Sequence, residues 1–346
     1  MSVKLTRVST SRRPDGRRVR LLIGAAIATS LLMGCQSIGG EDEGSEGTDG
    51  ETGGGGTQQL SIATGGTGGV YYPLGGGIAT LIREEIPDHD ATVQETNGSV
   101  DNMLLIQEGT ADLALALGDT VADAVEGAGE FEGNPVDACA LGHAYDNYTH
   151  LVTSTDSGIT SVEDLRGKVV SLGSPGSGTE TIGLRVLEAA GMDGDADIQR
   201  QQLGVDETAA GLRDGTIDAG FWSGGLPTGA LVEYATSGGM ALVPLGDQLE
   251  AMQEAYGEYY AEAVIPADTY EGQTEEVVTN LVPNVLIVSS DMSEDLQRDL
   301  TAVIFDNKER LVEVHPAAEE LDAETADEVD FVDVCPGAQS YFDEQS

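Results

Sequence analysis

The stretch 97-NGSVDNMLLIQEGTADLALALGD-119 recurs later in the chain as 203-LGVDETAAGLRDGTIDAGFWSGG-225. In each copy two glycines stand eleven residues apart, and an Asp follows at the same offset. These residues are Gly98, Gly109 and Asp112 in the first copy and Gly204, Gly215 and Asp218 in the second. Apolar residues at helical spacing predict a helix before the second glycine, which fits a left-handed helix end. The apolar run that follows is typical of a strand buried on both faces of a parallel sheet.

A second shared pattern precedes each copy. The segments 60-LSIATGGTGGVYYPLGGGIATLIREE-85 and 168-KVVSLGSPGSGTETIGLRVLEAAG-191 both consist of a short apolar run, a glycine-rich loop and a helical pattern. The chain therefore contains two units of the type β–loop–α–β–α–β, the pattern of an α/β domain with parallel strands. Two related units in one chain predict two lobes that face each other.

The two glycine-rich loops are candidate binding loops, because loops at the carboxyl ends of parallel strands form the ligand crevice. Each loop precedes a predicted helix and offers unpaired backbone N–H groups at the positive end of a helix dipole. In the second loop, Ser174, Ser177 and Thr179 add hydroxyl groups, and Gly176 and Gly178 allow a ligand to approach the main chain. This chemistry predicts the binding of a carboxylate or another small anion, largely by main chain.

Motifs for phosphate binding and catalysis are incomplete. Gly173 and Gly178 have the glycine spacing of a P-loop, but Thr179 stands in place of its lysine. A dinucleotide fingerprint beginning at Gly66 would need a glycine at Tyr71, and no G-x-S-x-G nucleophile elbow centres on this loop. The four histidines form no close metal-ligand pair. The sequence therefore predicts no catalytic residue, no metal site and no cofactor.

Aromatic residues make up only 5% of the chain, so their positions are informative. Tyr71 and Tyr72 lie at the first loop, and Phe221 and Trp222 lie in the last predicted strand of the second unit. A ring at these places can close over the carbon skeleton of a ligand. We expect Phe221 to be a core residue and Trp222 to reach the crevice.

The amino terminus has the features of an export signal. The segment 17-RRVRLLIGAAIATSLLMGC-35 has a cationic start and an apolar run of h-region length. Its end resembles a lipobox with Cys35 as the lipid-bearing residue, and its start resembles a twin-arginine signal, although Sec export stays open. Residues 36–57 are typical of a flexible tether rich in Gly and acids. We expect residues 1–35 to be a signal peptide and the protein to be extracytoplasmic and lipid-anchored to the outer face of the membrane; a single amphipathic or membrane helix is the alternative.

The formal net charge is −45, with 16 Lys and Arg against 61 Asp and Glu. A charge of this sign disfavours binding to a phosphate backbone, so we expect no nucleic-acid partner. The acids after residue 57 alternate with periodic apolar segments, which favours a folded protein with a carboxylate-rich surface over disorder. Such a surface is typical of halophilic proteins, because high salt screens its self-repulsion.

Six ordered motifs, covering about residues 59–342, resemble the TAXI solute receptors of tripartite ATP-independent periplasmic (TRAP) transporters. They are TGGTGGVYYPLGG from Thr64, GSVDNMLLIQEGTADLAL from Gly98, DSGITSVEDLRGKVVSLGSPGSGTE from Asp156, LRDGTIDAGFW from Leu212, IPADTYEGQTEEVVTN from Ile265 and CPGAQSYF from Cys335. Cys335 departs from the family, which usually carries His before Pro-Gly-Ala. Outside the cell Cys139 and Cys335 can form a disulfide or stay as two separate buried thiols.

The resemblance implies a two-lobed, Venus-flytrap fold of the type II periplasmic-binding-protein class. Lobe 1 would comprise residues 58–150 and 245–346, and lobe 2 residues 151–244. The return crossing is expected near residues 240–285, with carboxyl-terminal helices, including Leu296–Val314, packed on lobe 1. The protein would be a monomer that captures a small organic acid, such as glutamate or a dicarboxylate, and delivers it to TRAP integral-membrane permease subunits. The implied ligand contacts are Thr64, Gly65, Tyr71, Tyr72, Ser174, Ser177, Gly178 and Thr179, with Ser99, Asp119 and Trp222 around the rim.

Several alternatives stay open. The Asp119 carboxylate could accept a hydrogen bond from an ammonium group of the ligand, or it could cap a helix that starts at Thr120. A receptor of the same fold could serve an ABC importer or a sensor. An extracellular enzyme on this fold is disfavoured, because the sequence has no recognisable nucleophile or metal constellation.

Overall fold

The computed structural model describes residues 57–345. The predictions for the signal peptide, for the lipobox residue Cys35 and for nearly all of the tether lie outside the described residues. Helices and strands alternate through much of the described range, so the predicted α/β fold class is confirmed. No helix between residues 57 and 345 is both long enough and apolar enough to cross a bilayer.

The first predicted unit folds as expected. It consists of β1 (Gln58–Ala63), α1 (Tyr71–Glu85), β2 (His89–Gln94), α2 (Ser99–Gln107) and β3 (Leu113–Leu117). The strand β1 lies between β2 and β3 and is parallel to both. All five residues of β3 are buried, as a strand covered on both faces requires.

The second unit repeats this arrangement. It consists of β5 (Val169–Ser171), α4 (Gly178–Ala189), β6 (Gln199–Gln201), α5 (Val205–Asp214) and β7 (Ala219–Gly224). The strand β5 lies between β6 and β7 and is parallel to both. The spatial order β6-β5-β7 is therefore the counterpart of β2-β1-β3.

The repeat extends to individual hydrogen bonds. The Asp112 carboxylate accepts the N–H of Ser61 in β1 at 2.8 Å, and the Asp218 carboxylate accepts the N–H of Val169 in β5, also at 2.8 Å. The glycine before each Asp has a left-handed backbone, with φ of 66° and 68°. Equivalent aspartates thus fasten equivalent turns to equivalent strands, which confirms the internal repeat.

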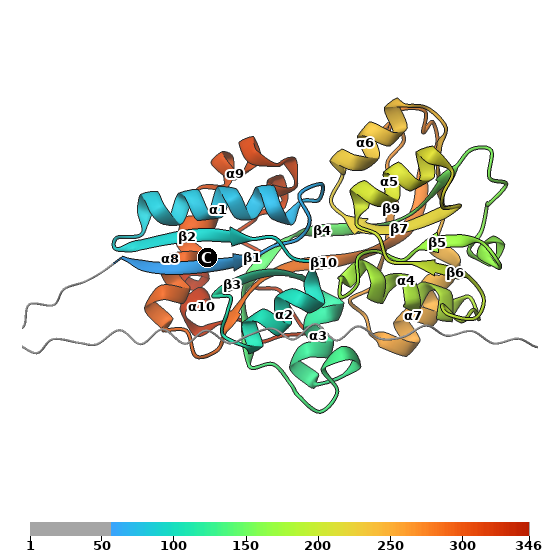
Figure 1. The fold of residues 1–346 in the computed structure, drawn as a ribbon. Coiled ribbons are helices and arrows are strands. Elements are labelled where there is room, and N and C mark those ends of the chain that lie inside the picture. The colour runs from blue at the N-terminus through green and yellow to red at the C-terminus, as the bar shows by residue number, and fades with distance from the viewer. Residues whose placement is uncertain (1–56, 346) are drawn as a thin grey trace, which may run out of the picture. The chain divides into compact units, whose positions relative to one another are not determined.

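Two long antiparallel strands join the units. They are β4 (Ala138–Ser154) and β10 (Val277–Ser289), and Figure 1 shows both running from one group of helices to the other. They complete a ten-stranded sheet whose main order is β2-β1-β3-β10-β4-β7-β5-β6, with β8 (Met240–Val243) on β4 and β9 (Ala261–Ile265) on β10. The pairing of β10 with β4 shifts register between Asn284 and Val285, close to where the strands pass from one unit to the other.

Four buried apolar clusters fill the space between the sheet and its helices. In the first unit, α1 covers one face of the sheet, and α2 and α3 (Gly118–Glu126) cover the other. In the second unit, α5 and α6 (Gly229–Thr236) cover one face, and α4 and α7 (Leu249–Tyr256) cover the other. The carboxyl-terminal helices α8 (Glu294–Phe305), α9 (Lys308–Val314) and α10 (Pro336–Gln345) add to the core of the first unit.

Two boundaries differ from the predictions. Leu249, Met252 and Tyr260 share a core cluster with Phe221, so the packing of the second unit continues past residue 244, the predicted end of lobe 2. The predicted helix over 296–314 is interrupted at Asp306 and Asn307, residues whose side chains compete with helical backbone hydrogen bonds. The Asn307 side chain donates to the carbonyl oxygen of Val303 at 3.0 Å.

Cys139 and Cys335 form a disulfide in the structure. Cys139 lies in β4, and Cys335 immediately precedes α10. The bridge joins positions 196 residues apart and attaches the carboxyl-terminal helix to the sheet of the first unit.

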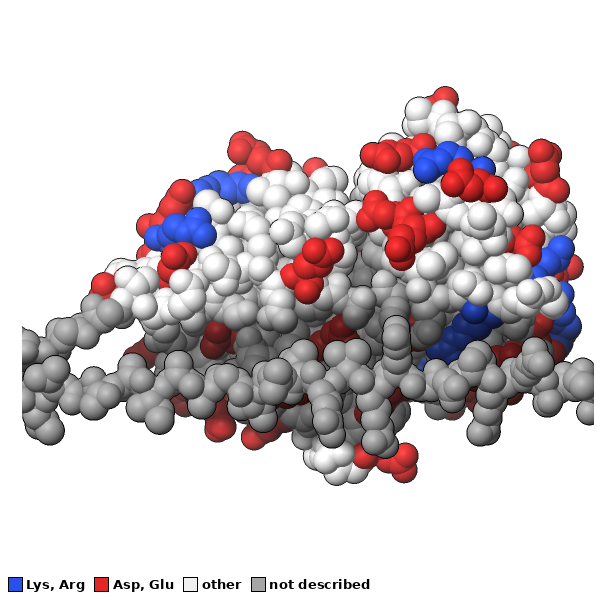
Figure 2. Space-filling model, viewed as in Figure 1, with Lys and Arg blue, Asp and Glu red and all other residues white. Residues whose placement is uncertain are grey.

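The surface is rich in carboxylates. On the face drawn in Figure 2, Asp and Glu side chains are spread over both units, and Lys and Arg are sparse. Several of the arginines are engaged by carboxylates; Arg310, for example, lies 2.6 Å from Glu84 and 3.0 Å from Glu85. This distribution agrees with a folded acidic protein, in which charge is placed on the surface of an apolar core.

Candidate functional site

A cavity lies where the two units meet. It contains about 640 Å³ of space, its open mouth included, and is lined by segments of both units. The part of this space that can hold the centre of a water-sized sphere is about 90 Å³. The walls come from the loop between β1 and α1, the start of α2, the strand β4, the loop between β5 and α4, the start of α5 and the end of β7.

Four helices begin at this cavity. Their first residues, Tyr71 of α1, Ser99 of α2, Gly178 of α4 and Val205 of α5, all line it. A helix start offers N–H groups without intrahelical partners and a partial positive charge. Among the residues that the structure describes, no Lys or Arg lines the cavity. Donors for an anion at this cavity would therefore come from main-chain N–H groups at the helix starts.

The loop between β5 and α4 presents hydroxyl groups to the cavity. The Ser177 hydroxyl accepts the N–H of Glu180 at 3.1 Å, and the Thr179 hydroxyl accepts the N–H of Ser223 at 3.2 Å. Neither hydroxyl donates to another described residue. Because each oxygen already accepts a hydrogen bond, each O–H hydrogen can point to an acceptor in the cavity. The arrangement suits a carboxylate, which only accepts.

Glycine is required where this loop meets the first unit. A Cβ at Gly178 would lie 2.3 Å from Cδ1 of Leu117 and 2.9 Å from Oγ of Ser99. A Cβ at Gly98 would lie 3.4 Å from Cβ of Ser177, and the Asp101 N–H donates to the carbonyl of Gly176 at 3.2 Å. The two units thus contact each other directly beside the cavity.

Tyr71 is fixed at the floor of the site. Its hydroxyl donates to the side-chain oxygen of Asn284 and lies 3.4 Å from Oγ of Ser99. Burial raises the pKa of Tyr71 above its usual range, so the phenol stays neutral. Ser99 in turn accepts the N–H of Leu117 at 3.1 Å. Both hydroxyls are held in place before any ligand enters.

The structure brings together most of the predicted contacts. Those that line the cavity are Gly65, Tyr71, Ser99, Ser174, Ser177, Gly178, Thr179 and Trp222. Thr64 is fully buried, with its hydroxyl donating to the carbonyl of Gln94 at 2.7 Å, and it supports the first loop from behind. Tyr72 is half-buried and lies outside the lining.

Asp119 does not lie at the rim of the cavity. It is fully buried in the first turn of α3, where Leu117 is the N-cap residue. Its carboxylate accepts the Tyr260 hydroxyl and the Thr120 N–H, each at 2.7 Å, and lies 3.5 Å from the Arg185 guanidinium. Both predicted roles for Asp119, at the rim and as an N-cap, are therefore replaced by a buried ion-pair network. Its partner Arg185 lies 66 residues away in the chain, so no local pattern could indicate the pair.

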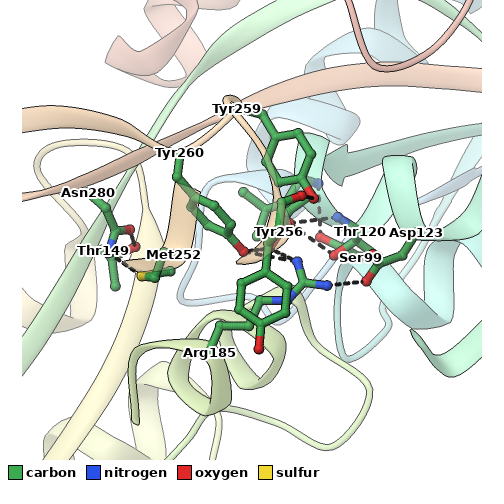
Figure 3. Close-up of polar contacts among 12 residues, drawn as sticks. Ser99, Thr120, Asp123, Thr149, Arg185, Met252, Tyr256, Tyr259, Tyr260 and Asn280 are labelled. Atoms are coloured by element: carbon green, nitrogen blue, oxygen red, sulfur yellow. Dashed lines mark hydrogen bonds and ion pairs between the residues drawn. The ribbon is translucent and has the colours of Figure 1, made fainter. Parts of the chain in front are cut away.

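Arg185 of α4 links the two units through its contacts with α3 (Figure 3). Its guanidinium contacts Asp123 of α3 at 2.5 Å, donates to the Tyr260 hydroxyl at 3.0 Å and lies 4.3 Å from the centre of the Tyr256 ring. Burial raises the pKa of Asp119 and of Asp123, although Arg185 opposes the shift. Since α3 follows the first unit and α4 carries Arg185 in the second, this network fastens one unit to the other.

Other lining residues were not predicted. Asn147 of β4 and Ser223 of β7 are buried and line the cavity, and the Asn147 side-chain oxygen and the Ser223 hydroxyl have no hydrogen-bond partner in the described part of the chain. Asn97 and Asp206 line it as well. The repeat could have indicated the start of α5, because Val205 is the counterpart of Ser99.

Comparison with known proteins identifies the family. The model of the NMT1-like family matches residues 62–346, and the chain belongs to this family. Similar solved structures include the periplasmic aliphatic sulphonate binding protein SsuA from Escherichia coli (16% identity, TM-score 0.43, 83% of each chain covered). They also include the alkanesulfonate-binding protein SsuA from Xanthomonas axonopodis pv. citri bound to MOPS (17% identity, TM-score 0.44, 83% of this chain and 84% of that chain covered). A third similar structure comes from work on glutathione import by GshT and the cystine ABC importer TcyBC of Streptococcus mutans. The match has 12% identity and a TM-score of 0.48, and it covers 76% of this chain and 94% of that one.

Proposed function

We propose that this chain is an extracytoplasmic solute-binding protein that captures a small organic acid between two lobes. The observation that carries the proposal is the meeting of four helix starts in one cavity. The Ser177 and Thr179 hydroxyls add donors to this field, and no cationic side chain of the described residues competes with them. Capture needs hydrogen bonds only and involves no covalent step, metal or cofactor.

The ligand would sit with a carboxylate at the helix starts. Glutamate and short dicarboxylates are the compounds that the resemblance implies. The first lobe would be built on the first unit and the carboxyl-terminal helices, and the second lobe on the second unit. The long strands β4 and β10 would act as the hinge, because they are the segments that pass between the two cores.

The membrane partner would be a TRAP permease. The six ordered motifs in the sequence support this assignment, and an ABC importer or a sensor is the alternative. Cys35, after processing, would carry the lipid that holds the protein at the outer face of the membrane. Co-purification from native membranes distinguishes the partners: a large integral-membrane permease without an ATPase supports the TRAP assignment, and an ATPase contradicts it.

Binding is tested by calorimetry in molar salt with L-glutamate, succinate and glutarate. We expect one of these acids to bind with one-to-one stoichiometry. The double substitution Ser177→Ala with Thr179→Ala removes two donors to a charged group and should weaken binding by at least about tenfold.

Ser177 is also the N-cap of α4, so its removal costs helix stability. Ser293→Ala is the matched control, because Ser293 caps α8 in the same way, with its Oγ accepting the N–H of Leu296 at 3.4 Å. Ser293→Ala should leave affinity unchanged. Equal affinity of the double variant and the wild type would contradict the assigned site.

A further inference from the structure

The indole N–H of Trp222 is turned away from the cavity that the ring lines. Nε1 donates to the Thr228 hydroxyl oxygen at 2.9 Å, and Thr228 is 1% exposed. The Thr228 hydroxyl donates to the carbonyl of Gly225 at 2.9 Å. The only donor of the ring is therefore satisfied inside the protein, and the ring presents carbon atoms to the cavity.

A buried chain of hydrogen bonds continues from Thr228. Its N–H donates to the Tyr270 hydroxyl at 3.1 Å, and this hydroxyl lies 2.9 Å from Nε2 of His150. The other ring nitrogen of His150, Nδ1, lies 2.8 Å from the carbonyl of Tyr148. Tyr270 and His150 are 2% and 1% exposed, so these hydrogen bonds are shielded from bulk water.

The direction of each bond follows from its ends. A carbonyl only accepts, so Nδ1 of His150 carries a proton. Burial lowers the pKa of His150 to about 4, so the ring is neutral and Nε2 is an acceptor. Tyr270 then donates to His150 and accepts from Thr228, and every polar atom in the chain has a partner that matches it.

The space around the indole is equally restrictive. A Cβ at Gly69, in the loop of the first unit, would lie 3.1 Å from Cη2 of Trp222. A Cβ at Gly224 would lie 2.4 Å from Nε1. Two glycines therefore leave the ring just enough room, one in each unit, and the ring spans the gap between the units.

We propose that Thr228, Tyr270 and His150 are positioning residues that hold Trp222 as an apolar wall of the cavity, and that this wall selects organic acids by the length of their carbon chain. The selectivity half of this inference rests on the proposed function, whereas the positioning half does not. Hydrophobic walls discriminate between neighbouring members of a homologous series by about tenfold or more per methylene. Without the Thr228 hydroxyl as its hydrogen-bond partner, the Trp222 indole would no longer be held in one orientation. The cavity wall would then no longer set the length of the carbon chain that fits.

The positioning half is tested without a ligand. The chain contains one Trp, so intrinsic emission reports Trp222 alone. We expect Thr228→Val and Tyr270→Phe to shift the emission maximum and to raise the acrylamide quenching constant. Thr228→Ser keeps the hydroxyl and should restore the wild-type values. Tyr234→Phe removes a hydroxyl that lies in the same core cluster but does not belong to this series of hydrogen bonds. It should change neither the emission maximum nor the quenching constant.

Wild-type emission and quenching in both Thr228→Val and Tyr270→Phe would overturn the positioning role. If Thr228→Val fails to fold, Tyr270→Phe against Tyr234→Phe decides the question alone.

The selectivity half is tested by calorimetry with succinate, glutarate and adipate. We expect the ratio of dissociation constants between the preferred acid and its neighbour in the series to fall by about tenfold in Thr228→Val, and to be kept in Thr228→Ser and Tyr234→Phe. An unchanged ratio together with altered emission would overturn the selectivity role. If the wild type binds none of the three acids and does not bind L-glutamate, the proposed function is contradicted, and the selectivity half with it. The emission measurements still decide the positioning half.

Discussion

Single residues determine what the cavity offers a ligand. Ser177 and Thr179 each accept a main-chain N–H, and this leaves their hydrogens as donors. Asn147 and Ser223 contribute buried polar atoms that have no partner within the described chain. A buried polar atom without a partner is costly, so binding is favoured for a ligand with an acceptor for the Ser223 hydroxyl and a donor for the Asn147 oxygen.

His150 makes a residue-scale prediction about pH. Its pKa is about 4 in the folded protein, below the ordinary value of 6.5. As pH falls below about 6.5, the unfolded chain takes up a proton that the folded protein does not, so the stability that neutral His150 contributes is lost down to about pH 4. Between about pH 7 and pH 5 we expect the free energy of unfolding to fall by about 2 kcal/mol from this residue.

The measurement is urea denaturation at both pH values in constant salt, for the wild type and His150→Gln. Acidic residues titrate in both proteins, so the difference between them isolates His150. The same pH dependence in both proteins would refute the prediction.

Elements of the fold are fastened by a few long-range links. One of these is the disulfide, which joins residues 196 positions apart and attaches the segment before α10 to β4. The α10 residues Tyr341 and Phe342 then pack beside Phe305 of α8, with ring centres 6.3 Å and 5.3 Å from it. The carboxyl-terminal helices are therefore part of the core of the first unit and not an appendage.

The disulfide gives the prediction at this scale. Replacing both Cys139 and Cys335 by Ser should lower the free energy of unfolding by about 2–5 kcal/mol, because the bridge closes a loop of 196 residues in the unfolded chain. The check is urea denaturation in molar salt, with and without a reductant. The reductant should destabilise the wild type and leave the double variant unchanged. Equal free energies of unfolding for the wild type and the double variant without reductant would show that the bridge does not stabilise the fold.

Across the whole described molecule, the contact between the two units has one strong polar link. Arg185 of α4 lies between Asp119 and Asp123 of α3, and all three side chains are largely buried. Burial raises the pKa of both carboxyl groups, and the single guanidinium that they share opposes this rise. The link is therefore strong only while Arg185 is present, because the cation offsets the cost of burying the carboxylates.

Arg185→Met makes the prediction at this scale. It leaves two buried carboxylates without a cation and should weaken the contact between the units by about 3–5 kcal/mol. We expect a larger radius of gyration in small-angle scattering and weaker ligand binding. Arg200→Met is the matched control, because Arg200 pairs with Glu180 and Asp195 inside the second unit. The same scattering profile for Arg185→Met and the wild type would contradict this role.

Much of the site could be predicted because it follows from local patterns. Glycine spacing, short apolar runs and hydroxyl-rich loops located Ser174, Ser177 and Trp222, all of which line the cavity. The prediction for Asp119 was wrong for a physical reason: its partners Arg185 and Tyr260 lie 66 and 141 residues away. Asn147 gave no signal either, since it is a polar residue in the middle of a long strand.

By itself the sequence determined the order of the elements, the duplication of the β–α–β–α–β unit and the two glycine-rich loops, which line the cavity. These follow from periodicity and from glycines with left-handed backbones, which act within a few residues of one another. Only the tertiary structure decided that Asp119 pairs with Arg185, that residues 249–282 pack with the second unit and that a buried chain from His150 reaches Trp222. Those contacts join residues distant in the chain, and their energies depend on packing and burial that no local pattern records.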